Sequence, residues 1–143
     1  MDRVQKSGSQ FAVRSEQADP FKKLKVWRKA HELTLAIYLA SRSFPREELY
    51  GYTSQIRRAA VSTPTNIVEG TRRRSPKDFR HFLNIAQSSN EEVKYLLFLG
   101  GELGYLSQAD TIKLSAFADE VGAMIHVFAE QLQAASCELQ TEL

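Results

Sequence analysis

The 143-residue sequence predicts an all-α protein, an antiparallel up-down four-helix bundle with a mobile N-terminal tail. Apolar residues recur at alternating spacings of three and four along four long stretches, two of which open with strong helix-start residues. No stretch alternates apolar and polar residues as a half-buried strand would. Helices of roughly 20–28 residues joined by short links favour this bundle. We expect a disordered tail over residues 1–20, the bundle over 21–135 and a frayed C-terminus over 136–143.

The first helix is predicted from Leu24 to Ser43. A cluster of basic residues surrounds its start, where the helix dipole disfavours each positive charge by roughly a few tenths of a kcal/mol. This cost is a mild indication of an external anionic partner, and a solvated helix start explains it as well. The apolar stripe consists of Val26, Ala30, Leu33, Ile37 and Ala40, and the basic cluster of Lys22, Lys23, Lys25, Arg28 and Lys29.

The second helix is predicted to open at Pro45, because a proline followed by Glu47 and Glu48 is a favourable first turn. Pro64 falls inside this helix. It cannot donate a hydrogen bond to the carbonyl of Ala60, so we expect a kink there. Gly70 is expected to end or loosen the helix.

The third and fourth helices each begin with a serine cap. Ser75 precedes a proline and has an acid three residues later, and Ser107 stands three residues before Asp110. The third helix is expected to stop between Gly101 and Gly104, and the fourth to carry its apolar stripe as far as Leu132.

The net charge of +2 conceals two opposed halves of the chain. Residues 1–80 contain 17 Lys/Arg and 8 Asp/Glu, a net charge of +9. Residues 81–143 contain 2 Lys/Arg and 9 Asp/Glu, a net charge of −7. Such a division indicates either an anionic partner or head-to-tail association of copies of the chain.

Catalytic and metal chemistry finds little support in the sequence. Only Asp78 and His81 approach the acid-x-x-His spacing of two-metal bundles, and Asp78 is better explained as part of a helix cap. The single Cys137 has no neighbouring base. We therefore expect no enzyme activity, no metal and no cofactor. One cysteine, no signal peptide and no membrane-spanning stretch predict a cytoplasmic protein without a membrane partner.

A second, polar stripe follows the predicted second helix at helical spacing. Two explanations compete for it. One is a hydrogen-bonded polar layer between helices or subunits, which the composition favours, and the other is a groove that faces a ligand. The stripe consists of Gln55, Arg58, Ser62, Asn66, Glu69 and Arg73.

The same region is rich in arginine. The segment from Gln55 to Arg80 contains seven basic residues and two acidic ones. Six of the seven are Arg, whose planar guanidinium can form two parallel hydrogen bonds to a phosphate. Three consecutive arginines fit a helix end, where they can spread apart. A nucleic-acid backbone site and a solvated turn paired with acids from residues 81–143 both explain them. The candidates are Arg57, Arg58, Arg72, Arg73, Arg74, Lys77 and Arg80.

Several runs of residues form a distinctive set of motifs. They are Leu24–Trp27 with Ala30, Phe44-Pro45 with Glu48, Thr53–Ser62 followed by Pro64, Asn66-Ile67 and Glu69-Gly70, and Phe82–Ala86 with Ser89 and Glu92. These motifs resemble a known family, the four-helix-bundle proteins encoded in intervening sequences of large-subunit ribosomal RNA genes. Relatives of that family include the accessory variability determinant of diversity-generating retroelements. The resemblance covers about residues 21–132.

The resemblance implies a homo-oligomer, a pentamer with a central channel. It also implies RNA or DNA and a reverse transcriptase as possible partners, because the retroelement branch binds both. The chain departs from the family at Ser88, where Gly is frequent, and in its acidic second half. That acidity would confine nucleic-acid binding to the face formed by the first two helices.

Two hypotheses follow. The favoured one is a non-enzymatic, oligomeric accessory protein that contacts a phosphate backbone through its basic face. The alternative is a protein-interaction scaffold in which the basic face of one copy docks on the acidic face of the next, so that ring assembly uses the arginines.

Overall fold

The computed structural model describes residues 19–141, in which no strand is formed and four long α-helices account for most of the chain. The prediction of an all-α four-helix fold is confirmed. Most of the predicted N-terminal tail, residues 1–18, lies outside the described residues, as do 142–143. The elements are η1 (Pro20–Lys23), α2 (Lys25–Ser41), η2 (Arg46–Glu48), α3 (Tyr52–Thr71), α4 (Pro76–Glu102) and α5 (Gln108–Thr141), where η denotes a 3₁₀ helix.

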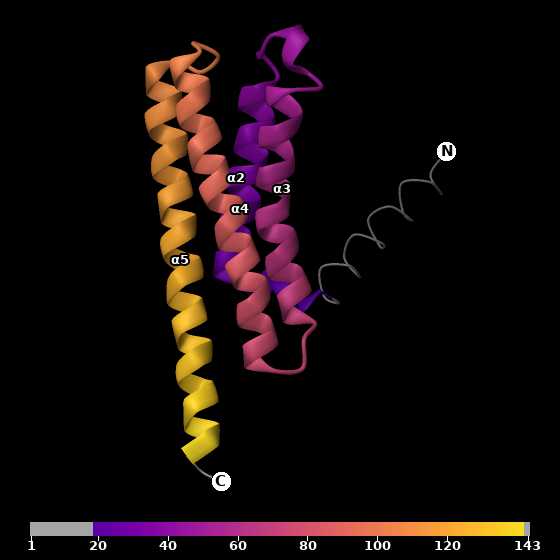
Figure 1. Ribbon diagram of the computed structural model, residues 1–143, viewed down its shortest axis with the longest axis vertical. Helices are drawn as coiled ribbons and strands as arrows, with labels where there is room; N and C mark the ends of the chain where they lie inside the picture. Colours follow the sequence, from indigo (N-terminus) through magenta and orange to yellow (C-terminus); the bar gives the residue numbers. More distant parts are fainter. Residues whose placement is uncertain (1–18, 142–143) are drawn as a thin grey trace, which may run out of the picture.

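The helices pack side by side, with α3 against α2 and α4, and α5 against the same two helices. The α2–α3 and α4–α5 connections lie at one end of the bundle, and the α3–α4 turn lies at the other (Figure 1). The start of α2 therefore shares an end with the α3–α4 turn, although the whole of α2 and α3 separates them in the sequence.

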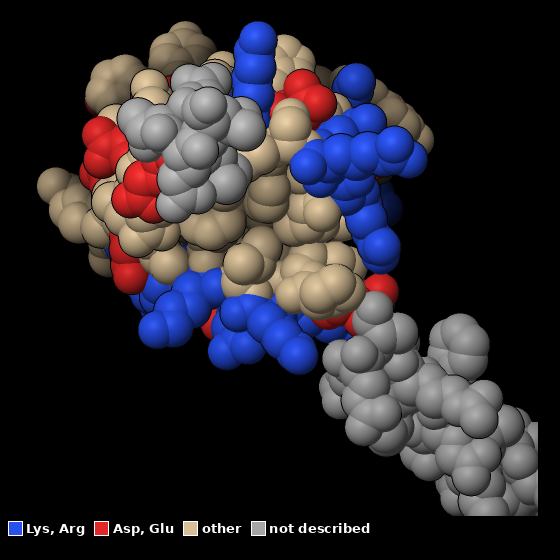
Figure 2. Space-filling model, turned by 90° about the horizontal axis from the view of Figure 1, so that it is seen from below, with Lys and Arg blue, Asp and Glu red and all other residues tan. Residues whose placement is uncertain are grey.

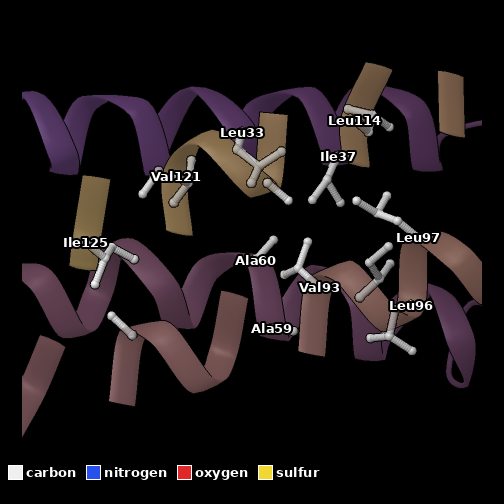
Figure 3. Packing of buried hydrophobic residues seen from close by; sticks show 14 of the residues in the cluster. Leu33, Ile37, Ala59, Ala60, Val93, Leu96, Leu97, Leu114, Val121 and Ile125 are labelled. Atoms are coloured by element: carbon white, nitrogen blue, oxygen red, sulfur yellow. The ribbon is translucent and has the colours of Figure 1, made fainter. Parts of the chain in front are cut away.

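One core runs along the bundle and takes side chains from all four helices (Figure 3). Most of its members belong to the apolar stripes that the periodicity predicts, although Ala40 is only partly buried, and the largest members are almost completely removed from water. Truncating one such side chain to alanine typically costs about 2–5 kcal/mol. The labelled residues include Leu33 and Ile37 of α2, Ala59 and Ala60 of α3, Val93 and Leu97 of α4, and Val121 and Ile125 of α5.

The prediction that the second helix opens at Pro45 is wrong. The chain instead forms the short 3₁₀ helix η2, with hydrogen bonds from Leu49 N–H to the Arg46 carbonyl and from Gly51 N–H to the Glu48 carbonyl. Gly51 then takes a non-helical conformation before α3 begins. Glycine has a poor helix propensity, and this position interrupts the run that Pro45 and its acids would otherwise start.

α3 continues through Pro64 as one helix. Because Pro64 has no N–H, the carbonyl of Ala60 loses its helical donor. The Thr34 hydroxyl of α2 lies 2.9 Å from that carbonyl and donates to it, sharing its single hydrogen with the Ala30 carbonyl of its own helix. A cross-helix hydrogen bond thus satisfies the buried group that the proline leaves open.

Replacing Thr34 with valine is expected to destabilise the protein by about 1–3 kcal/mol, because the buried Ala60 carbonyl then has no donor. Thr34→Ser keeps the hydroxyl and serves as the control. Urea denaturation measures both. Equal stability of the valine variant and the wild type would contradict this role for Thr34.

The predicted serine caps are both present. Ser75 Oγ accepts from Asp78 N–H at 3.1 Å, and Ser107 Oγ accepts from Asp110 N–H at the same distance. α4 ends at Glu102, and Gly104 has φ +77°, as the predicted stop requires. α5 extends further than expected, because it remains helical to Thr141 rather than ending near residue 135.

Tyr52, at the start of α3, fills the space beside Gly100 of α4. It is buried and donates a hydrogen bond to the Leu96 carbonyl. Burial raises its pKa from 10.0 to about 12. The folded protein therefore holds this proton more tightly than the unfolded chain, so the resulting stability is complete below pH 10 and is lost as the pH rises towards 12.

The free energy of unfolding is expected to fall by about 2 kcal/mol between roughly pH 9 and pH 11.5 through Tyr52 alone. Tyr52→Phe lacks the titrating hydroxyl and isolates this contribution from other groups that titrate at high pH. Urea denaturation of both proteins at the two pH values measures the difference. An identical loss in the two proteins would refute the assignment to Tyr52.

Candidate nucleic-acid interface

The α3–α4 turn presents the run of three arginines to solvent. α3 can end close to α4 because Gly70 lacks a side chain: a Cβ there would lie 2.8 Å from Phe79 Cδ1 and 3.2 Å from Phe82 Cβ. The aromatic residues therefore anchor the turn from the inside. The arginines are left outside, and Arg72, Arg73 and Arg74 are all exposed.

The start of α2 adds a second set of basic residues to this end of the bundle, because η1 packs against α3. Viewed from this end, Lys and Arg side chains gather along two sides of the bundle (Figure 2). We call this surface the basic end. The basic end consists of Lys22, Lys23, Lys25, Arg28, Lys29, Arg72, Arg73, Arg74, Lys77 and Arg80.

Few of these cations are neutralised within the described residues. Lys22 lies 3.7 Å from Asp19, and Lys29 lies 3.4 Å from Glu120. Arg73 lies 3.5 Å from Glu69 on its own helix and stacks over Phe82 at 4.4 Å from the ring centroid. Arg28 forms no ion pair, but its Nη2 donates to the Lys22 carbonyl at 3.2 Å. The exposed cations of the basic end that form neither an ion pair nor a side-chain hydrogen bond in the described part of the chain are Lys23, Lys25, Arg72, Arg74 and Lys77.

The explanation that acids from residues 81–143 pair with the turn therefore finds no support in residues 19–141. The one ion pair of the turn uses Glu69, which belongs to α3. Arg80 is half-buried, and its Nε is buried without a hydrogen-bond partner in the described residues. It lines a cleft of about 370 Å³ with Lys77, His81 and Asn84 at the start of α4.

Arg57 and Arg58 do not belong to the basic end, although they are close in sequence to the arginines of the turn and were predicted to share their site. They precede Arg72 by about four helical turns, or roughly 20 Å. Arg57 Nε donates to Ser41 Oγ at 2.8 Å, and its guanidinium lies over the Tyr38 ring, so it joins α3 to α2. Arg58 is exposed on a different side of α3.

The polar stripe divides into two parts, of which one forms hydrogen bonds between helices and the other lines an open cavity. Ser62 Oγ lies 2.8 Å from Ser89 Oγ, and Asn66 Nδ2 donates to the Ser62 carbonyl, which makes a polar layer between α3 and α4. Nearer the start of α3, Gln55 and Arg58 line an open cavity of about 640 Å³. Glu69 takes part in neither, because it pairs with Arg73.

Residues that were not predicted from the sequence complete this cavity. Tyr50 and Ser54 precede Arg58 at intervals of four residues. On the helix predicted from Pro45 this spacing would place them on the same face as Arg58, so the sequence pattern could have identified them. Glu92 closes it from α4, with Gln55 Nε2 at 3.5 Å from Glu92 Oε1. That contact depends on the helix pairing, which spacing along one helix does not show.

Residues 19–141 contain neither a candidate metal site nor a candidate membrane-spanning helix. No group of three or more His, Cys, Asp or Glu side chains there is arranged to hold a metal ion. None of the helices in the same range combines the length and apolar character needed to cross a membrane.

These features define an all-α four-helix protein whose basic residues concentrate at one end. The chain belongs to the 23S rRNA-intervening sequence protein family, whose model matches residues 22–127. The family resemblance found in the sequence is thereby confirmed.

A solved structure shares the fold. It is a protein of unknown function from the S23 ribosomal protein family of Bacteroides thetaiotaomicron, with a TM-score of 0.68 and 24% sequence identity. The alignment covers 73% of this chain and 97% of that one. Among curated proteins, none matches this chain.

Proposed function

We propose that the protein binds the phosphate backbone of a nucleic acid through the basic end. The observation that carries the proposal is the set of five exposed cations, without an ion pair or a side-chain hydrogen bond, that η1, the start of α2, the α3–α4 turn and the start of α4 bring together. Cations without acid partners are free to replace the counterions of a polyanion, and that release drives backbone binding. Membership of a family named for ribosomal RNA intervening sequences is consistent with such a partner.

Binding at this site is expected to be independent of base sequence. Arg72 and Arg74 can each offer two parallel N–H groups to a phosphate, whereas Lys23, Lys25 and Lys77 act as point charges. The exposed lysines and arginines lie on helix ends and a turn rather than along one helix face that could enter a groove. Contacts of this kind position a protein on the backbone without reading bases.

A mobility-shift experiment tests the proposal. The protein is titrated against a labelled RNA duplex, a DNA duplex and a single strand at low salt, about 0.05 M, and we expect a shift with at least one of them. Absence of a shift with all three would overturn the proposal.

The alternative of a scaffold is favoured by a different observation, the exposed apolar side chains of the bundle. Leu35 and Leu39 lie one turn apart on α2 and are more than half exposed, as are Tyr95, Phe98 and Ile112 on α4 and α5. Apolar surface of this kind is typical of a contact between proteins. We therefore propose, as a second function, self-association through these exposed apolar side chains.

Size-exclusion chromatography with light scattering measures the molar mass and distinguishes a ring held by charge from an association held by apolar side chains. In the ring model suggested by the charge division, substituting Arg72, Arg73 and Arg74 with alanine lowers the mass. In the apolar model Leu35→Ser with Leu39→Ser lowers it instead. A monomer under all conditions would remove both forms of self-association.

A further inference from the structure

The open cavity at the start of α3 is separate from the basic end. It lies at the opposite part of α3, near the α2–α3 connection, and has a volume of about 640 Å³. Cavities of this size hold small organic ligands. Its polar and aromatic lining consists of Tyr50, Ser54, Gln55, Arg58, Ser62 and Glu92.

Two of the lining side chains have no structural task in the described part of the chain. Tyr50 is 93% exposed, so its ring contributes almost nothing to the core. Arg58 is exposed and forms no hydrogen bond, ion pair or ring contact with the residues that the structure describes. Its neighbour Arg57, by contrast, is engaged with both Ser41 and Tyr38.

The side chains that line the cavity offer groups of three different kinds to a ligand. An exposed tyrosine ring offers a stacking surface for a planar group, and a free guanidinium matches a phosphate or carboxylate. The Ser54 hydroxyl can donate to the same anion, while the Glu92 carboxylate on α4 can accept from hydroxyl groups. A planar ring, a set of hydroxyls and an anionic group in one molecule describe a nucleotide.

We propose that this cavity binds one nucleotide unit, with the base on Tyr50, the sugar hydroxyls towards Glu92 and the phosphate on Arg58. The unit can be a free mononucleotide or one nucleotide of a single strand, since both carry the same groups. Stacking on an aromatic ring tolerates every base, so the proposal implies little base preference.

The serine pair on the same stripe lies at the edge of the cavity. The Ser62–Ser89 contact joins α3 to α4 through two short side chains, and one turn earlier Arg58 lines the cavity. Gln55 and Glu92 approach only to 3.5 Å, close to the limit for a hydrogen bond. The Ser62–Ser89 hydrogen bond therefore joins the two helices beside the cavity, and the longer Gln55–Glu92 contact is one that a ligand can replace.

Isothermal titration calorimetry of the full chain tests this with adenosine 5′-monophosphate, adenosine and inorganic phosphate as separate probes. We expect the monophosphate to bind with a sub-millimolar Kd. Tyr50→Ala is expected to weaken the monophosphate and adenosine by about tenfold and leave phosphate unchanged. Arg58→Gln is expected to weaken the monophosphate and phosphate by about tenfold and leave adenosine unchanged.

Matched controls are available on the same surface. Leu49→Ala removes an exposed large side chain next to Tyr50 and Arg46→Gln removes another exposed arginine, and neither residue lines the cavity. Both should bind the monophosphate as the wild type does. A short single-stranded oligonucleotide that binds at least tenfold more tightly than the monophosphate would identify the strand as the source.

Three outcomes would overturn the proposal. The first is no detectable heat with the monophosphate at millimolar concentration. The second is an equal effect of the cavity variants and the control variants on binding. The third is a lower molar mass of the cavity variants without any nucleotide binding, which would make the cavity a contact between copies of the chain. The variant with Arg72, Arg74 and Lys77 changed to alanine should still bind the monophosphate. This distinguishes failure of the cavity from failure of the basic end.

Discussion

Replacing Arg72, Arg74 and Lys77 together with alanine is expected to weaken nucleic-acid binding roughly 10²- to 10³-fold at about 0.1 M salt. Each phosphate contact adds about 0.9 to the magnitude of the slope of log K against log salt, which corresponds to nearly a factor of ten at this salt concentration. The three side chains are exposed and make no ion pair in the described residues. Their removal should therefore cost binding without costing stability.

The matched control removes the same three charges from the other end of the bundle. Arg42, Arg46 and Lys113 are exposed and lie at or near the α2–α3 and α4–α5 connections. If binding depends on the basic end, this control loses only the small long-range effect of net charge, within about threefold. Equal losses in the two triple variants would mean that net charge, and not the basic end, holds the nucleic acid.

Replacing Gly100 with alanine is expected to destabilise the protein by about 3 kcal/mol. A Cβ at this position would overlap the Tyr52 hydroxyl and lie 3.0 Å from Tyr52 Cζ and 3.3 Å from Leu106 Cδ1. Overpacking of a tight core typically costs about 1–3 kcal/mol, and displacing Tyr52 also breaks its hydrogen bond to the Leu96 carbonyl. Urea denaturation of the two proteins gives the difference in the free energy of unfolding.

Ser88→Ala is the control for this substitution, because it also introduces an alanine into the interior of α4, but at an exposed position. It should change stability by less than about 1 kcal/mol. Combining Gly100→Ala with Tyr52→Phe removes the overlapping hydroxyl. The double variant should therefore be more stable than the sum of the two single effects predicts. Additive effects would refute the proposed contact.

The helices could be predicted where local physics determines them. The serine caps at Ser75 and Ser107 and the stop near Gly104 depend on residues within one turn, so the sequence identifies them. The start of the second helix could not be predicted in the same way. Pro45 with two acids fits both a 3₁₀ turn and an α-helix, and Gly51 decides between them six residues later.

The candidate site was predicted where it depends on a turn and missed where it depends on helix pairing. The exposure of Arg72 and Arg74 follows from their position at a helix end. Arg57 is adjacent to Arg58, but it faces α2, and only the packing of the two helices reveals this. The charge division between the halves of the chain likewise appears as a basic end, because the direction of α2 brings its lysines to the α3–α4 turn.

The salt dependence of binding tests the central claim most directly. If the basic end uses its five unpaired cations on a duplex, log K should fall against log salt with a slope of about −4.5, and the triple variant at Arg72, Arg74 and Lys77 should have a slope of about −2. A wild-type slope near zero, or the same slope in both proteins, would contradict the account.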